Sequence, residues 1–250
     1  MKNILKQEKK WLLEEKYDGK KSGAFFADLK KLDTGIPLAY LIGNIPFLDC
    51  FIDLSYKPLI PRTETEFWVN DFIKQHQNET SIEILDIFSG SGCIGLGILK
   101  NLKNVNVDFA ELNPEYIKQI KKNLKLNFSA IPKRWKIFKS NVFGNIPLKK
   151  YDVILANPPY IAKNRKKKVQ NSVLKNENYS TLFANDNGLY FIKKIITEGQ
   201  NYLKPSGEMW IEFDSWQVPL INEFLKKQKI KNYKFWIDQY NKKRVLIINF

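Results

Sequence analysis

From residue 81 onward, short apolar runs alternate with stretches of helical length, and this alternation limits the possible folds more than any other feature. The predicted elements, in chain order, are strand 82–87, helix 93–102, strand 105–110, helix 114–126, strands 135–138 and 151–156, helix 188–203, strand 207–213, helix 218–228, and strands 233–237 and 244–250. Strands separated by helices are typical of a parallel sheet covered on both faces. The last two strands, joined by a short turn, predict an antiparallel pair at the sheet edge. We therefore expect an α/β fold with a seven-stranded, mostly parallel sheet and a terminal antiparallel hairpin.

The chain before residue 81 follows a different pattern. The first 35 residues have helical apolar spacing, with a second short helix predicted at 24–32. Two β-rich pieces at 45–48 and 51–54 predict a hairpin, and Thr63 is predicted to cap the helix that follows Pro61. We expect three parts: a short helical N-terminal region at 1–37, a hairpin linker at 38–62 and a main domain at 63–250.

The chain is strongly basic, with 41 Lys and Arg against 26 acidic residues and a formal net charge of +15. Such a charge favours a nucleic-acid partner. However, all but four of the basic residues are lysines, whereas bidentate recognition of bases and phosphates favours arginine. The charge alone therefore does not establish a nucleic-acid-binding role.

Two cysteines and one histidine exclude several kinds of site. Cys50, Cys93 and His76 are too few for a Cys/His zinc centre or a disulfide framework, so we predict no metal. His76 stands at the polar end of a predicted helix, where we expect a solvated surface residue, and a Ser-His-Asp triad is discarded. The sequence shows neither a signal peptide nor an 18-residue apolar run, and we expect a cytoplasmic protein without a membrane span.

A glycine-rich loop follows the first strand of the predicted sheet and precedes a helix. Gly90 and Gly92 let the backbone approach a ligand, and the helix N-terminus beyond them favours negative charge. Glu111, at the end of the next strand, can accept both ribose hydroxyl protons of a nucleoside cofactor. The spacing of glycines from 90 to 95 also fits NAD. Asp86 favours S-adenosylmethionine, because a carboxylate there can hold an ammonium directly or through water; alternatively, it only caps the loop backbone.

The segment Asn157-Pro158-Pro159-Tyr160 follows another apolar strand, at the edge where open α/β sheets bind ligands. Its acceptor pair, the Asn157 side-chain oxygen and the Pro158 carbonyl, lies beside the flat face of Tyr160. This pair suits a planar NH2 group conjugated to a carbonyl or a ring, and it can aim the nitrogen at a methyl sulfonium. No dedicated general base is needed. The alternative is a plain turn with Tyr160 in the core.

Together, the loop from Asp86 to Gly92 and the Asn157–Tyr160 segment resemble class I S-adenosylmethionine methyltransferases with a Rossmann-like fold. Within these, the chain most resembles the HemK/PrmC family, which methylates N5 of the glutamine in the Gly-Gly-Gln motif of peptide chain release factors. Segments 35–43 and 59–66 resemble that family's Gly-Glu-Pro-x-x-Tyr-x-x-Gly and Leu-Ile-Pro-Arg-Pro-Glu-Thr-Glu. The resemblance runs from about residue 10 to the C-terminus.

The resemblance implies a role for each matching position. Phe88, Ser89, Gly90, Ser91 and Gly92 would wrap the methionine part of S-adenosylmethionine, Glu111 its ribose, and Asn141 and Val142 its adenine, while Asn157, Pro158, Pro159 and Tyr160 would receive the substrate glutamine. Three features depart from the family: Asn141 replaces an Asp, Thr63 replaces a Pro, and the helical N-terminal region is short.

The main alternative is methylation of adenine N6, or of another exocyclic amino group, in rRNA or DNA. Such a group presents the same planar NH2, and the lysine-rich loop at 163–168 directly after the site suits a polyanion. A third interpretation, a non-catalytic binding protein, is disfavoured because Asn157 and the glycines are intact. We expect a monomer with a release factor as its protein substrate, and nucleic acid only indirectly or as the alternative substrate.

Overall fold

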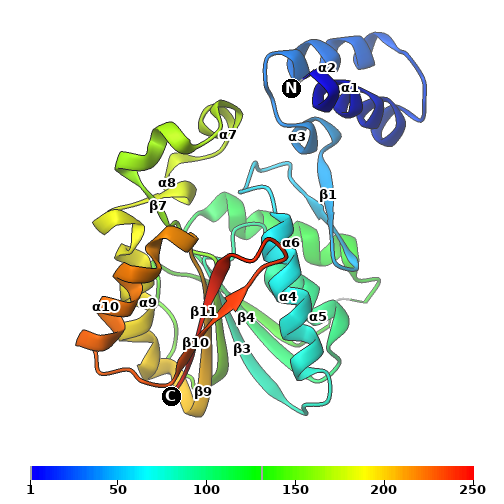
Figure 1. Cartoon of the computed structure of the whole chain (residues 1–250). Coiled ribbons are helices and arrows are strands. Elements are labelled where there is room, and N and C mark those ends of the chain that lie inside the picture. Colours follow the sequence, from blue (N-terminus) through cyan, green and yellow to red (C-terminus); the bar gives the residue numbers. More distant parts are fainter. Residues whose placement is uncertain (1, 131) are drawn as a thin grey trace.

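The computed structural model describes residues 2–130 and 132–250, so Met1, in the predicted N-terminal region, and Ile131 lie outside the described residues. Figure 1 shows the arrangement of the elements. In chain order they are α1 Lys2–Trp11, η1 Leu12–Lys16, α2 Gly23–Asp33, α3 Leu38–Ile42, β1 Asn44–Phe47, β2 Cys50–Asp53, α4 Thr63–His76, β3 Ile82–Ile87, α5 Cys93–Asn101, β4 Val105–Glu111, α6 Pro114–Asn127, β5 Trp135–Lys139, β6 Tyr151–Ala156, β7 Ile161–Ala162, η2 Lys163–Lys168, α7 Asn171–Asn176, α8 Tyr179–Leu182, β8 Phe183–Ala184, η3 Asp186–Gly188, α9 Tyr190–Gly199, η4 Gln200–Tyr202, β9 Leu203–Glu212, η5 Ser215–Gln217, α10 Val218–Lys227, β10 Tyr233–Ile237 and β11 Lys243–Asn249.

The seven-stranded sheet has the predicted architecture. Its strand order is β10-β11-β9-β6-β3-β4-β5, and the five strands from β9 to β5 pair in parallel. β11 is antiparallel to both β9 and β10, which confirms the terminal hairpin at the edge. The register places Ile87 of β3 opposite Ala110 of β4 and Ala156 of β6, so the C-terminal ends of three central strands lie side by side.

Helices cover both faces of the sheet (Figure 1). Side chains alternate between faces along each strand. In β3, Ile84 packs in the cluster formed with α4, α5 and α6, whereas Leu85 packs in the cluster formed with α9 and α10. Gly95 lets α5 approach β4 closely, because an added Cβ would stand 2.3 Å from Cε1 of Phe109. Gly95, the last glycine of the spacing from 90 to 95, is therefore needed for the close packing of α5 on β4.

Two predicted boundaries are wrong near the end of the chain. The helix predicted at 188–203 spans only Tyr190–Gly199, because Asn187 and Gly188 have φ of 53° and 83°, outside the helical region. The strand predicted from 207 begins at Leu203, which pairs with Tyr151 before the register shifts. The small elements from β7 to β8 have no counterpart in the prediction.

Two side-chain expectations in α4 are also wrong. Arg62, not Thr63, is the N-cap residue, and the Thr63 hydroxyl contacts Glu64, because the chain turns helical one residue early. His76 is 8% exposed rather than solvated, stacked on Phe72 with its Nε2 3.0 Å from Glu208 Oε1. Burial alone would lower the pKa of His76, but the hydrogen bond and charge of Glu208 raise it.

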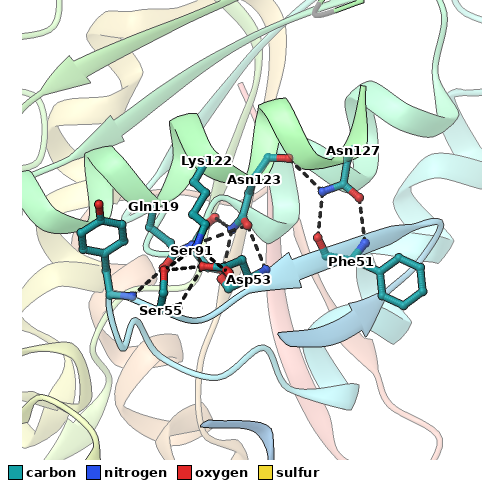
Figure 2. A network of polar contacts seen from close by, with 9 residues as sticks. Phe51, Asp53, Ser55, Ser91, Gln119, Lys122, Asn123 and Asn127 are labelled. Atoms are coloured by element: carbon teal, nitrogen blue, oxygen red, sulfur yellow. Dashed lines mark hydrogen bonds and ion pairs between the residues drawn. The ribbon is translucent and has the colours of Figure 1, made fainter. Parts of the chain in front are cut away.

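The hairpin β1–β2 forms as predicted and lies on α6 (Figure 2). Three amides spaced four residues apart on α6, those of Gln119, Asn123 and Asn127, hydrogen-bond the backbone of the segment from Phe51 to Tyr56. We call these three side chains the amide ladder. Asn123 also donates to the Ser91 carbonyl at 2.9 Å, which connects the hairpin to the glycine-rich loop.

Helices α1 to α3 have an apolar cluster of their own, and Figure 1 shows them set apart from the sheet, beyond β1. Its buried members are Leu12, Phe25, Leu32 and Leu41. Lys16 and Tyr17 both donate to the Asp28 carboxylate at 2.7 Å. In the part of the chain described, no helix is both long and apolar enough to cross a membrane.

Candidate active site

Four loops meet where β3, β4, β5 and β6 end, and they line a first cavity of about 240 Å³. Nine of the predicted site residues line it: Phe88, Ser89, Gly90, Ser91, Glu111, Asn141, Val142, Asn157 and Pro159. Pro158 and Tyr160 line a second cavity instead, while Asp86 and Gly92 line neither. Of the thirteen predicted site residues, eleven therefore line one of two neighbouring cavities, while Asp86 lies behind the loop and Gly92 closes its turn.

The glycine-rich loop depends on left-handed backbone conformations. Phe88, Gly90 and Gly92 have φ of 62°, 56° and 80°. The Gly92 N–H donates to the Ser89 carbonyl at 2.7 Å, which closes the turn. At Gly92 an added Cβ would also stand 2.9 Å from a Leu96 side-chain carbon, so both conformation and space favour glycine.

Glu111 joins two of the loops. Its Oε2 accepts the Gly90 N–H at 2.9 Å and its Oε1 accepts the Asn113 N–H at 2.8 Å. Burial raises the pKa of this carboxyl, although the backbone hydrogen bonds oppose the rise. A carboxylate has about four acceptor sites, so each oxygen of Glu111 keeps a lone pair for two adjacent hydroxyls in the first cavity.

Asp86 lies behind the loop and is fully buried. Its Oδ2 accepts the Gly95 N–H at 3.1 Å, and its Oδ1 has no hydrogen-bond partner. The pKa of Asp86 is raised to about 8, mainly by burial and also by the charge of Glu111, while the hydrogen bond from Gly95 opposes the rise. The hydrogen bond from Gly95 is the backbone contact that the capping interpretation predicts. The other oxygen, Oδ1, is a buried acceptor without a partner, which an ammonium or a water molecule could satisfy.

Asn157 stands between the two cavities and lines both. The second cavity, of about 460 Å³, is also walled by Arg165, Trp216 and Arg244. The Asn157 Nδ2 donates to Thr65 Oγ1 at 3.1 Å, which leaves its side-chain oxygen as the acceptor of this residue. Tyr160 lines the second cavity and also packs against the core cluster formed with α9 and α10, so this segment has features of both interpretations.

A buried carboxylate that the sequence analysis missed lies beneath this segment. Glu212 accepts hydrogen bonds from Thr65, Trp68 and Tyr160 at 2.8, 2.8 and 3.1 Å. Burial raises the pKa of Glu212, and the three hydrogen bonds oppose the rise. The signal for it in the sequence is a carboxylate between the apolar residues Ile211 and Phe213 at the end of β9.

The segment from β7 to α8 covers the site. Arg62 binds both oxygens of the buried Glu177 at 2.8 Å, which fastens this segment to the start of α4. Within it, the guanidinium of Arg165 lies 4.3 Å from the Trp216 ring centroid. In the described part of the chain, no group of three His, Cys, Asp or Glu side chains could hold a metal ion.

Comparison with known proteins identifies a family of methyltransferases. The family model for the Methyltransferase small domain matches residues 65–185. The "Release factor glutamine methyltransferase" of Streptococcus pneumoniae is 32% identical, over 85% of this chain and 75% of that protein. The protein of the same name from Flavobacterium psychrophilum is 31% identical, over 89% of this chain and 78% of that protein.

Solved structures agree on the fold. The catalytic domain of hMettl16, in complex with a MAT2A 3'UTR hairpin, superposes with a TM-score of 0.62 at 19% identity, covering 81% of this chain and 76% of that chain. SMU.776, a putative methyltransferase from Streptococcus mutans complexed with SAH, has a TM-score of 0.54 at 13% identity, covering 76% and 50%. The predicted class I methyltransferase fold is confirmed, and the cofactor is S-adenosylmethionine. By its identity to these curated relatives over most of their length, the chain belongs to the release factor glutamine methyltransferase family.

Proposed function

We propose that the protein transfers a methyl group from S-adenosylmethionine to the side-chain amide nitrogen, N5, of the glutamine in the Gly-Gly-Gln motif of peptide chain release factors. The observation that carries this proposal is the place of Asn157 between the two cavities, with its side-chain oxygen left as an acceptor. The names of the curated relatives support the choice of substrate.

The first cavity fits S-adenosylmethionine. Glu111 has free lone pairs for the ribose hydroxyls, the loop from Phe88 to Gly92 provides a tight turn for the methionine part, and Asn141 and Val142 provide a wall for the adenine. The orphaned Asp86 oxygen suits a nearby ammonium, through water where needed. When bound, the cofactor supplies an electrophilic methyl group on a sulfonium.

The second cavity is the approach for the acceptor. The Asn157 oxygen and the Pro158 carbonyl accept the two N–H protons of the glutamine amide, while Tyr160 lies against its flat face. Two acceptors orient the nitrogen and favour its pyramidal form, so that its lone pair points toward the first cavity. Positioning and electrostatics then supply most of the catalysis. The nitrogen donates its lone pair to the methyl carbon, and the methylated amide loses one of its two N–H protons to water, so no dedicated base is needed.

A nucleic-acid acceptor remains the second candidate, because aromatic and basic side chains are interleaved beside the second cavity. Arg165 stacks over Trp216, and Lys166 lies 5.7 Å from the Tyr179 ring centroid. Such pairs suit stacked bases and phosphates. An adenine amino group would meet the same two acceptor oxygens.

We further propose that the protein acts as a cytoplasmic monomer on release factors. Its parts would be the helical region at 1–37, the hairpin linker at 38–62 and the methyltransferase domain at 63–250. The apolar cluster of α1 to α3 supports a separate N-terminal unit, although it includes Leu41, so α3 shares this cluster with the helices before residue 37. The docking of the hairpin on α6 supports treating the hairpin as a part of its own.

Labelled S-adenosylmethionine tests the proposal when the protein is incubated with a release factor and, separately, with total RNA. We expect label on the release factor, and none when the glutamine of its Gly-Gly-Gln motif is replaced. Asn157→Ala should abolish transfer while changing the free energy of cofactor binding by at most about 1–2 kcal/mol, since it removes one hydrogen bond to a neutral partner. Asn78→Ala, in an exposed turn, is the control. Label on RNA alone, or full turnover by Asn157→Ala, would contradict the proposal.

A further inference from the structure

We propose that Thr65 and Glu212 are positioning residues that hold the Asn157 side chain with its oxygen toward the acceptor. This inference rests on the proposed function and adds two residues to it. Thr65 lies on α4 and Glu212 at the end of β9, so the chain of hydrogen bonds joins elements far apart in the sequence. Neither residue belongs to the loop or to the Asn157–Tyr160 segment.

The hydrogen bonds run in one direction. The Thr65 hydroxyl donates to Glu212 Oε2 at 2.8 Å, and Thr65 Oγ1 accepts from Asn157 Nδ2 at 3.1 Å. A hydroxyl carries a single proton. Once that proton points to Glu212, only lone pairs of Thr65 face Asn157, and they require the N–H side of its amide.

Trp68 fixes the start of this chain. Its indole N–H, which can only donate, lies 2.8 Å from the same Glu212 Oε2. That oxygen is therefore an acceptor whether or not the carboxyl carries a proton on its other oxygen. Thr65 has to donate to it, and both Thr65 and Glu212 are nearly inaccessible to water, at 1% and 3% exposure.

The orientation of Asn157 decides whether the acceptor pair exists. An amide has an oxygen on one side and an NH2 group on the other, with nearly the same shape. With the amide reversed, Asn157 would present N–H protons to the N–H protons of the substrate amide, and one of the two acceptors would be lost. Tyr160 also donates to Glu212, through Oε1 at 3.1 Å, so one carboxylate supports both polar side chains of the segment.

Thr65→Val tests the inference, because it keeps the shape of the side chain and removes the hydroxyl. We expect kcat for release factor methylation to fall about 10- to 100-fold, as for a slightly misplaced reacting group. The Kd of S-adenosylmethionine should change less than about twofold, since no proposed cofactor hydrogen bond is removed. Thr65→Ser, which restores the hydroxyl, should recover most of kcat. Thr197→Val, at an exposed position of α9, is the matched control.

A double-substitution cycle reads the orientation itself. An Asp side chain at position 157 has two acceptor oxygens, so it presents an acceptor to the substrate even when the side chain is rotated by half a turn. In protein carrying Asn157→Asp, adding Thr65→Val should therefore lower single-turnover rates by less than about threefold, far below its effect beside Asn157. Equal effects in both backgrounds would overturn the inference.

The outcomes separate this inference from the proposed function. Wild-type protein that labels only RNA contradicts the release factor proposal, and the same variants can then be assayed on that RNA. Wild-type activity on release factor with an unchanged kcat in Thr65→Val overturns the positioning role alone. If Thr65→Val lowers the melting temperature of the protein without ligand, Thr65→Ala is used in its place. An unchanged kcat in Thr65→Ala would likewise overturn the positioning role.

Discussion

Glu111 combines a structural and a binding role in one side chain, because its carboxylate ties the Gly90 and Asn113 backbones together and still faces the first cavity. We predict that Glu111→Ala weakens S-adenosylmethionine binding by about 1.5–3 kcal/mol, the range for hydrogen bonds to charged groups. Isothermal titration calorimetry measures the change. Glu115→Ala, an exposed carboxylate on α6, should leave the affinity unchanged.

Unchanged affinity in Glu111→Ala would contradict its assignment to the ribose. The melting temperature without ligand separates this outcome from a collapse of the loops, which the loss of two backbone acceptors could cause. Glu111→Gln keeps one acceptor oxygen and should lie between the wild type and Glu111→Ala.

At the scale of single residues, the sequence predicted those side chains that follow the ends of strands. Glu111 and Asn157 were found because the ends of neighbouring parallel strands meet in space. Thr65 and Glu212 were missed, because their hydrogen bond joins positions 147 residues apart and local spacing carries no trace of it. His76 was misplaced for the same reason: its partner Glu208 comes from a distant strand.

At the scale of elements, the amide ladder lets one face of α6 form hydrogen bonds with the hairpin backbone, as a neighbouring strand would. Asn127 exchanges two hydrogen bonds with the backbone of Phe51, and Asn123 does the same with Asp53 (Figure 2). The sequence predicted α6 as an amphipathic helix and β1–β2 as a hairpin. It did not predict that they pair, because amides at four-residue spacing also suit a solvated helix face.

Asn123 and Asn127 of the amide ladder have different neighbours, and this predicts different effects. Asn127→Ala and Asn123→Ala should each lower the free energy of unfolding by about 1–3 kcal/mol, because backbone groups lose their partners. Asn123→Ala should also weaken S-adenosylmethionine binding several-fold, since Asn123, unlike Asn127, donates to the Ser91 carbonyl of the loop. Denaturant unfolding and calorimetry measure the two quantities.

Asn127→Ala is thus the control for Asn123→Ala within the same ladder. Equal cofactor affinity in both variants would show that the Asn123–Ser91 hydrogen bond does not affect cofactor binding by the loop. Burial alone would raise the pKa of Asp53, but hydrogen bonds from Gln119, Lys122 and Ser55 lower it to about 2. Its contribution to stability is therefore complete above the pKa of the unfolded chain and declines as the pH falls toward 2, outside the range of these assays.

At the scale of the whole molecule, the alternation of strands and helices predicted the sheet, its strand directions and its edge hairpin. The covering segment from β7 to α8 could not be predicted, because its short elements lack a periodic pattern. Instead, contacts such as the Arg62–Glu177 pair hold it in place. The net charge of +15 likewise says nothing about where a partner binds until the loop at 163–168 is placed beside the second cavity.

The position of charge, rather than its sum, is therefore expected to govern the encounter with substrate. Replacing Lys163, Lys166, Lys167 and Lys168 with Gln should lower kcat/KM for the release factor by at least about threefold at low salt, with kcat unchanged, because steering by local charge acts on association. The difference should vanish near 0.5 M salt, roughly where the Debye length falls well below 10 Å. Replacing Lys226, Lys229, Lys231 and Lys234, on and beyond the C-terminal end of α10, removes the same net charge and should have no such effect. An equal loss of kcat/KM from both sets of substitutions would show that the charge of the whole surface attracts the substrate. No loss from either set would show that the loop at 163–168 acts only through the packing of Arg165 on Trp216.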